Sequence, residues 1–198
     1  MWNRRDERLD LEYSCFVNIL VTGFAPWGKH RVNPSGVLAT ALGGHVLPVE
    51  FDGAASELRR LVAQQRPAAI LMLGLAAERK RISLEALALN LEHHEGKGKQ
   101  HRWLRTIRKG GPLALRTNLP LGRIFERLRG GGVPVTISHH AGTYVCNRVF
   151  YEGLSVFKGP CGFVHVPPFK ALSQARQLAA IRTILAAMGG SSSPAATR

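Results

Sequence analysis

The sequence predicts a single α/β domain in which helices pack on a twisted, mainly parallel sheet. Three observations support this fold class. The chain has 198 residues, enough for one domain with a sizeable core and too few for two. Short apolar runs alternate with stretches of helical periodicity, the pattern of a mainly parallel sheet covered by helices. Several runs end at glycine or proline, which interrupt strands and helices.

Each expected strand is a short apolar run bounded by turn residues. The first ends at Gly23, the run A-A-I-L-M-L ends at Gly74, and G-F-V-H-V ends at the double proline Pro167-Pro168. Residues 83–90 fit either a strand or a helix. The expected strands are 18–22, 44–49, 68–73, 133–138 and 162–166, and the expected helices are 54–65, 121–129, 146–154 and 173–188.

The two ends differ in composition from the middle of the chain. Residues 1–17 are rich in charge and lack the apolar stretch of a secretory signal. Residues 189–198 are small and polar, so we expect a disordered tail. The folded domain should therefore span 18–188. Because no apolar run approaches the about 20 residues of a membrane span, we expect a cytoplasmic protein.

Cysteine and histidine usage argues against disulfides and metals. The three cysteines, Cys15, Cys146 and Cys161, are an odd and sparse set, which suits a reducing compartment. No Cys-x-x-Cys spacing occurs, and neither His93–His94 nor His139–His140 has the spacing of a helical zinc site. We therefore predict no metal site.

Strong basicity leaves a second reading open. The net charge is +14 and the pI near 10.8. Between residues 93 and 129 there are ten Lys or Arg and two Glu. This stretch is either a solvated face or a surface for an acidic partner or nucleic acid. Only Trp103 and Phe125 are aromatic residues interleaved with the charges, and no nucleic-acid motif is visible.

Three residues suit nucleophilic catalysis. Cys146 follows the turn residues Ala141-Gly142-Thr143 and begins a helix, where the helix dipole favours a thiolate and the Cys146 N–H is available to an oxyanion. His165 lies one residue before the end of its strand, near the edge where sites of α/β sheets occur. Glu85 interrupts an apolar run, so it is either a buried acid that orients the histidine or an exposed surface residue.

At these residues the chain resembles the pyroglutamyl peptidase I family. The resemblance covers roughly 19–188, and its most specific block is A-G-T-Y-V-C-N at 141–147. Further blocks are G-F-V-H-V-P at 162–167, V-T-G-F-x-P-[FW]-G at 21–28 followed by N-P-S at 33–35, and G-L-A-x-x-R at 74–79 before I-S-L-E.

The resemblance implies a cysteine peptidase with a three-layer α/β/α fold and no cofactor, which removes N-terminal pyroglutamate from peptides. It implies that Cys146 is the nucleophile, His165 the general base and acid, and Glu85 the residue that orients His165. The lactam ring would contact Phe24, Trp27, Leu75 and Tyr144. The resemblance also implies a homo-oligomer, often a homotetramer.

The chain departs from the common family pattern at three places. Leu75 replaces a glutamine, Ala77-Glu78 replaces Gly-Gly, and a basic loop at 92–109 replaces the P-D-N-x-G loop. These changes indicate a divergent member and leave two other functions open. One is hydrolysis of another small amide or lactam by the same site. The other is a non-catalytic basic module that binds RNA or another polyanion.

Overall fold

The computed structural model describes residues 18–28, 31–95 and 102–189. The expected N-terminal extension and most of the expected tail, with Cys15, lie outside the described residues. Gly189, which we assigned to the tail, is the last residue of a helix. No helix within the described ranges combines the length and the apolar character needed to cross a bilayer.

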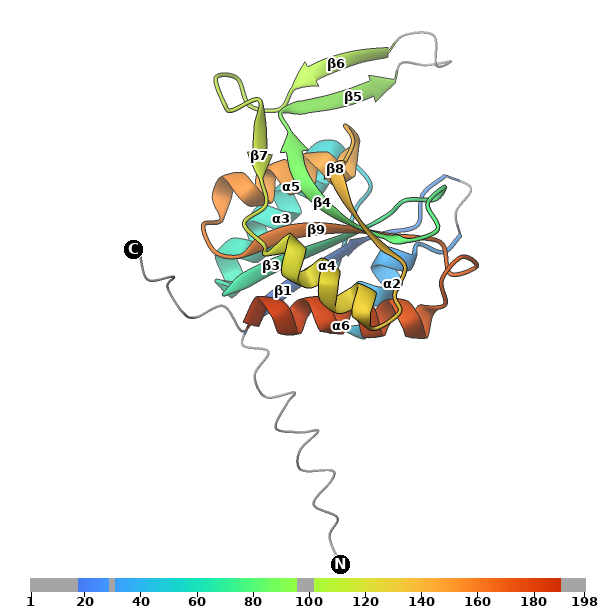
Figure 1. Cartoon of the computed structure of the whole chain (residues 1–198). Coiled ribbons are helices and arrows are strands. Elements are labelled where there is room, and N and C mark those ends of the chain that lie inside the picture. The colour runs from blue at the N-terminus through green and yellow to red at the C-terminus, as the bar shows by residue number, and fades with distance from the viewer. Residues whose placement is uncertain (1–17, 29–30, 96–101, 190–198) are drawn as a thin grey trace, which may run out of the picture.

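A seven-stranded sheet forms the centre of the molecule (Figure 1). Its strands are β1 (Ile19–Phe24), β2 (His45–Leu47), β3 (Ala69–Leu75), β4 (Ile82–Leu89), β7 (Ala114–Arg116), β8 (Val135–His140) and β9 (Cys161–Val166). Strands β2, β1, β3 and β9 are neighbours in that order and run parallel. Strand β4 pairs antiparallel with β9 and β7 and parallel with β8. The sheet is thus mixed but mainly parallel, as predicted. Of residues 83–90, which fitted either a strand or a helix, 83–89 belong to β4 and Asn90 follows it.

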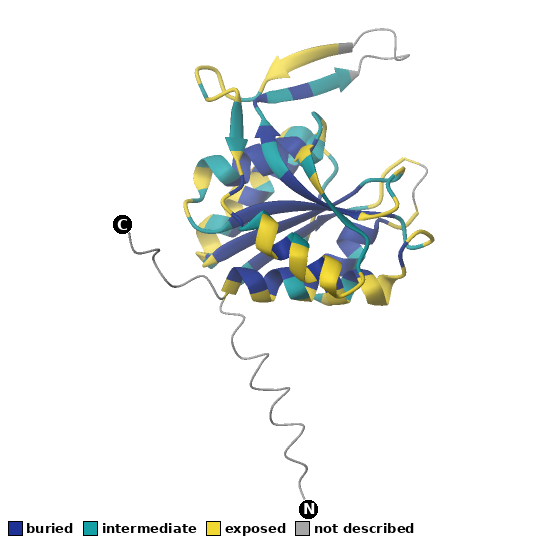
Figure 2. Cartoon of the chain, viewed as in Figure 1, coloured by how far each residue is buried: buried dark blue, intermediate teal, exposed yellow. Residues whose placement is uncertain are grey.

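Helices cover both faces of this sheet. They are α2 (Pro34–Ala41), α3 (Phe51–Gln65), α4 (Leu121–Gly130), α5 (Val145–Val156) and α6 (Gln174–Gly189). One apolar core joins α2, α4 and α6 to one face, and a second joins α3 and α5 to the other. Figure 2 shows the central strands buried between the two helical layers, whereas β7 and β8 are partly exposed. The three-layer α/β/α fold is confirmed, although α2 was not among the expected helices.

A two-stranded hairpin projects from the body where we expected a basic loop at 92–109 (Figure 1). Strands β5 (Leu91–Glu95) and β6 (Arg102–Thr106) pair antiparallel, so the expectation of a loop was wrong over these residues. Cross-strand pairs of polar residues stabilise the hairpin. The His94 ring stacks on that of Trp103 at 5.7 Å between centroids, and Glu92 accepts a 2.5 Å hydrogen bond from Arg105.

Charged side chains tie the hairpin to α5. Glu92 is fully buried and lies 3.4 Å from Nε of Arg148, while Nη1 of Arg148 donates to Glu152 at 2.9 Å. Asp52 of α3 lies 3.4 Å from Nη2 of the same guanidinium. Arg148 thus balances three carboxylates where α3, α5 and the hairpin meet.

Candidate active site

The predicted catalytic residues meet at one edge of the sheet. His165, next to the last residue of β9, lies in register with Gly74 of β3 on one side and with Ser83 of β4 on the other. The side chain of His165 is nearly buried, and that of Glu85 is completely buried. Glu85 is therefore not the exposed surface residue that the sequence left open.

Glu85 pairs with the imidazole of His165. The Oε1 atom of Glu85 lies 2.7 Å from Nδ1 of His165. A carboxylate only accepts hydrogen bonds, so Nδ1 carries the proton and its N–H donates a hydrogen bond to Glu85, which leaves Nε2 as the basic nitrogen. This arrangement suits a general base held in one tautomer by an acid.

Arg79 adds a second donor to the same carboxylate oxygen. Its Nη1 atom donates to Oε1 of Glu85 at 2.7 Å. Burial raises the pKa of Glu85, but hydrogen bonding to His165, the His165 charge and hydrogen bonding to Ser138 and Arg79 together outweigh burial and hold the pKa below its ordinary value. Glu85 is therefore ionised at neutral pH. The sequence analysis quoted Arg79 within a family block without giving it a role.

Gly74 lets the Cys146 thiol approach the sheet. A Cβ atom at position 74 would lie 2.9 Å from Sγ of Cys146 and 2.7 Å from Cζ of Phe163, both too close for a real contact. The sulfur therefore packs on the bare backbone of Gly74, the strand neighbour of His165. A glycine directly after an apolar strand run was the available signal, which we interpreted only as a strand end.

The thiol is partly buried at the start of α5. Burial raises the pKa of Cys146 to about 12, and the negative charge of Glu85 acts in the same direction. The backbone N–H of Cys146 and the charge of Arg79 lower the pKa by less. The expectation that the helix dipole would favour a thiolate is therefore outweighed by burial, and the resting group is a neutral thiol.

Asn147 fixes the first turn of α5 against the sheet. Its side chain donates to the carbonyl oxygens of Leu89 and Leu91 at 2.8 Å each, and its Oδ1 accepts from the N–H of Leu89 at 2.8 Å. The residue after the thiol is thus fully buried and bonded to the backbone where β4 passes into β5. Its position directly after Cys146 was the only signal in the sequence.

An apolar cavity of about 430 Å³ opens beside the thiol. All four predicted ring contacts line it together with the thiol and the imidazole: Phe24, Trp27, Leu75, Tyr144, Cys146 and His165. Phe24 and Leu75 are buried, whereas Trp27 and Tyr144 are 38% and 53% exposed and lie at the mouth. Among the described residues, no carboxylate lines this cavity, and no cluster of three metal-ligating side chains occurs.

The family model for pyroglutamyl peptidase matches residues 17–183. The chain belongs to this family. The pyrrolidone-carboxylate peptidase of Halalkalibacterium halodurans is 36% identical, with 78% of this chain and 86% of that protein covered. The enzyme of the same name from Deinococcus radiodurans is 35% identical, with 79% and 81% covered. The fold class and the enzyme class expected from the sequence are confirmed.

Solved structures of pyrrolidone carboxyl peptidases share the fold. The structure from Thermococcus litoralis superposes with a TM-score of 0.80 at 28% identity, over 86% of this chain and 92% of that chain. The structure from Thermus thermophilus superposes with a TM-score of 0.77 at 34% identity, over 85% and 98%. The α/β/α body is therefore that of the pyroglutamyl peptidase family.

The Asn33-Pro34-Ser35 block of this family member fixes the Phe24 wall of the cavity. Asn33 caps α2, its Oδ1 accepting from the N–H of Ser35 at 3.1 Å, and its Nδ2 donates to the carbonyl of Ala25 at 3.0 Å. The Ser35 hydroxyl accepts from the N–H of Phe24 at 3.2 Å. Asn33 and Ser35 therefore cap the start of α2 and also hold the segment that carries Phe24 in place.

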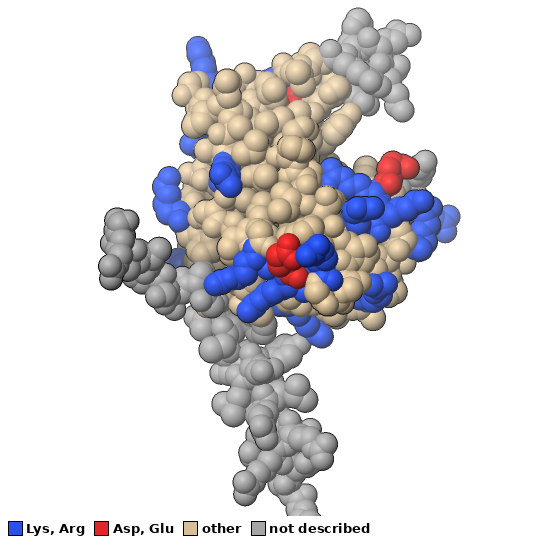
Figure 3. Space-filling model, in the orientation of Figure 1, with Lys and Arg blue, Asp and Glu red and all other residues tan. Residues whose placement is uncertain are grey.

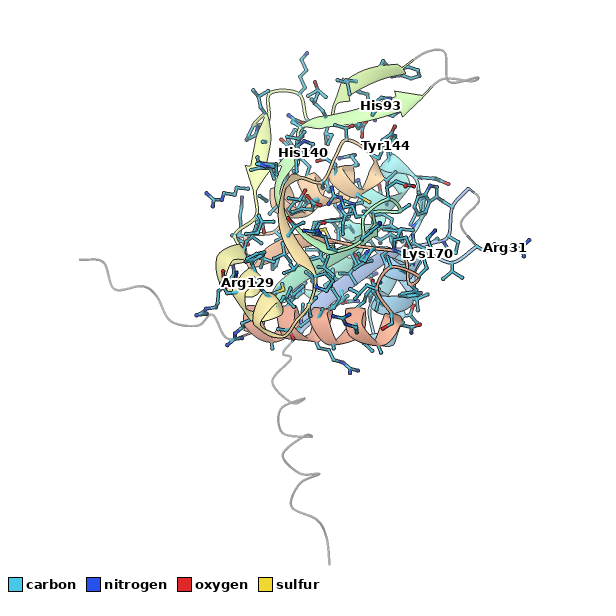
Figure 4. The ribbon with its side chains drawn as sticks, turned by 45° about the vertical axis from the view of Figure 1, so that its right-hand side comes forward. Arg31, His93, Arg129, His140, Tyr144 and Lys170 are labelled. Carbon is cyan, nitrogen blue, oxygen red and sulfur yellow. The ribbon has the colours of Figure 1, made fainter. Side chains whose placement is uncertain are left out.

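The hairpin supports the Tyr144 wall of the cavity. The N–H of His93 donates to the carbonyl of Thr143 at 2.7 Å, and the rings of His93 and Tyr144 stack with 5.2 Å between centroids. Figure 4 shows the two residues side by side, one from β5 and one from the turn before α5. The segment that departs most from the common family pattern therefore contacts a residue that lines the cavity.

Proposed function

We propose that the chain removes an N-terminal pyroglutamyl residue from peptides, with Cys146 as nucleophile, His165 as general base and acid, and Glu85 as the residue that orients His165. The observation that carries the proposal is the Cys146 thiol, packed on Gly74 next to the Glu85–His165 pair, at the wall of an apolar cavity. The relatives' shared name supports the same substrate.

The reaction would proceed through an acyl-enzyme. Since the thiol is neutral, Nε2 of His165 takes its proton as Sγ of Cys146 attacks the pyroglutamyl carbonyl carbon. The N–H of Cys146 donates to the resulting oxyanion. The imidazolium then gives its proton to the leaving amine as the C–N bond breaks and a thioester forms. Water, losing a proton to His165, hydrolyses the thioester and releases pyroglutamate and the thiol.

The cavity suits a neutral ring. An ordinary peptide begins with an ammonium group, which needs an anionic partner when it is buried. No carboxylate lines the described walls of the cavity, whereas Phe24 and Leu75 offer apolar contact. Pyroglutamate is an uncharged five-membered lactam, and it meets both conditions. We extend the proposal to a reducing cytoplasm, which keeps the thiol free, and to a domain spanning 18–188.

Release of a reporter amine from a pyroglutamyl amide, compared with the prolyl amide, tests the proposal. Proline has the same ring size but carries a charged amine in place of the lactam. We expect preference for the pyroglutamyl amide by at least about 100-fold, and loss of several orders of magnitude of rate in Cys146→Ser. Equal rates on the two amides would favour another small amide as substrate. Salt-sensitive RNA binding without hydrolysis would favour the basic module.

A further inference from the structure

A second pocket, of about 330 Å³, lies on the other side of the catalytic residues. It lies where β4 and β8 run parallel, beside the loop from β3 to β4. Its lining includes Arg79, Lys80, Arg81, Ser83, Ser138 and His139. In the sheet order β3, β9, β4, β8, the apolar cavity lies at β3 and β9 and this pocket at β4 and β8. The two pockets therefore flank His165.

The pocket carries excess positive charge. Arg79 pairs with Glu85, but Lys80 and Arg81 are exposed and form no ion pair with any described residue. Figure 3 shows Lys and Arg gathered on the right of the view, over the loop from β3 to β4. Glu78, exposed and next to Arg79 in the chain, offsets part of this charge, but the three consecutive cations still outnumber Glu78 and the buried Glu85 and leave a net attraction for an anion.

Ser83 supplies an independent indication of a ligand. It is fully buried, and its hydroxyl has no hydrogen-bond partner among the described residues. Burying a hydroxyl without a partner costs free energy, so such groups in folded proteins usually have a ligand or water to bind. Because Ser83 lines the pocket, its O–H is placed to donate to an anion held by the cations.

The pocket lies close to the reacting groups. Ser83 is the register partner of His165, and Arg79 donates to Glu85. If the lactam occupies the apolar cavity, the amine that His165 protonates leaves away from that cavity. The residues after the scissile bond then pass beside Ser83 and the loop at 79–81.

We propose that this pocket binds a carboxylate of the leaving peptide, so that the enzyme prefers an acidic residue soon after the pyroglutamate. This inference rests on the proposed function and adds a substrate class to it. Lys80 and Arg81 attract the carboxylate, and the Ser83 hydroxyl donates to it. Neither the apolar cavity nor the catalytic residues Cys146, His165 and Glu85 would produce this preference, because neither interacts with the side chain of the residue after the pyroglutamate.

Two isosteric substrates test the preference, pyroglutamyl-glutamyl-alanine amide and pyroglutamyl-glutaminyl-alanine amide. We expect kcat/KM for the glutamyl peptide to be about 5–10-fold higher at low salt, because opposite charges attract. High salt should reduce the ratio by screening. Lys80→Ala/Arg81→Ala should bring the ratio close to 1, and Ser83→Ala should lower it. The control Lys109→Ala/Lys158→Ala removes two exposed cations that do not line the pocket and form no ion pair with any described residue, and it should keep the wild-type ratio.

Two results would overturn the inference. One is a wild-type ratio of 1, which would exclude the subsite; acetate that then changes the hydrolysis of both peptides equally would show that the pocket takes free anions only. The other is an equal loss of the ratio in the control variant, which would show that overall charge causes the preference. If neither peptide is hydrolysed, the proposed function itself fails, and the substrate class fails with it.

Discussion

The backbone of Gly74 and the sulfur of Cys146 are in direct contact, at a distance that leaves no room for a side chain on residue 74. Gly74 is also the strand neighbour of His165. One glycine therefore sets how closely the thiol approaches the strand that lies beside His165.

Gly74→Ala should lower kcat about 10–100-fold, because the new methyl group displaces the thiol and small misplacements of reacting atoms are costly. It should also lower the melting temperature, since the methyl group overlaps Phe163. Reporter-amine release and thermal unfolding measure the two effects. Gly122→Ala is the matched control, because its new methyl group would meet nothing within 4 Å. A Gly74→Ala enzyme with the wild-type kcat would show that the contact has no catalytic importance.

The raised pKa of Cys146, about 12, predicts how the thiol reacts with iodoacetamide. Only the thiolate reacts, so the alkylation rate should rise about tenfold per pH unit from pH 7 to 10. The experiment uses Cys15→Ser, because Cys15 lies outside the described residues. Cys161 is fully buried and should stay unmodified. A rate that levels off below pH 8 would instead indicate a resting thiolate–imidazolium pair, and would show that burial does not dominate.

Glu85→Gln should lower kcat by about 100-fold or more, because the amide offers His165 a donor as well as an acceptor and no longer holds one tautomer. The variant also tests the lowered pKa of Glu85. A carboxyl with a lowered folded-state pKa stabilises the protein above its unfolded pKa, and this stability is lost as pH falls through the folded pKa.

The difference in unfolding free energy between wild type and Glu85→Gln should therefore be largest near pH 7 and shrink toward acid pH. Urea unfolding at several pH values measures it. A difference that stays constant from pH 7 to the acid range would mean that the pKa of Glu85 is the same in the folded and unfolded chain.

Arg148→Ala should destabilise the fold by about 1–3 kcal/mol, since it removes the buried cation that Glu92 and Glu152 share and leaves each with a single exposed arginine, Arg105 or Arg59. Urea unfolding followed by circular dichroism measures the loss. The control Arg60→Ala removes an exposed arginine, paired with Glu57 on the same helix, and should leave the urea midpoint nearly unchanged. Equal midpoints for the two variants would show that Arg148 acts as a surface residue.

The sequence predicted the central strands and the larger helices because apolar residues dictate them locally. Glu85 was harder to interpret, because its strand is buried and so lacks the alternation that separates strand from helix. The hairpin was missed for a different reason. Its residues carry charges and rings instead of an apolar pattern, and pairs such as His94 with Trp103 become visible only once the strands are aligned.

In the candidate site too, residues with a local sequence signal were predicted, and residues whose roles depend on long-range contacts were missed. Cys146 and His165 lie at a turn before a helix and at a strand end, which are local signals. The contributions of Gly74, Arg79 and Asn147 depend on contacts between segments distant in the chain. Residue type alone does not reveal them, because a glycine after a strand and an asparagine in a helix each have ordinary structural uses.

The hydrogen bonds of Asn33 and Ser35 join the Phe24 wall of the cavity to the start of α2. The conformational entropy of ordering the Phe24 segment is therefore lost during folding, before any substrate arrives. Binding then needs to supply less ordering free energy, which favours affinity for a small, rigid ring. The same arrangement restricts divergence. A substitution at Asn33 that reshapes the Phe24 wall for another substrate also removes the α2 cap. A change of specificity at this position therefore lowers stability, and the loss must be offset elsewhere in the chain.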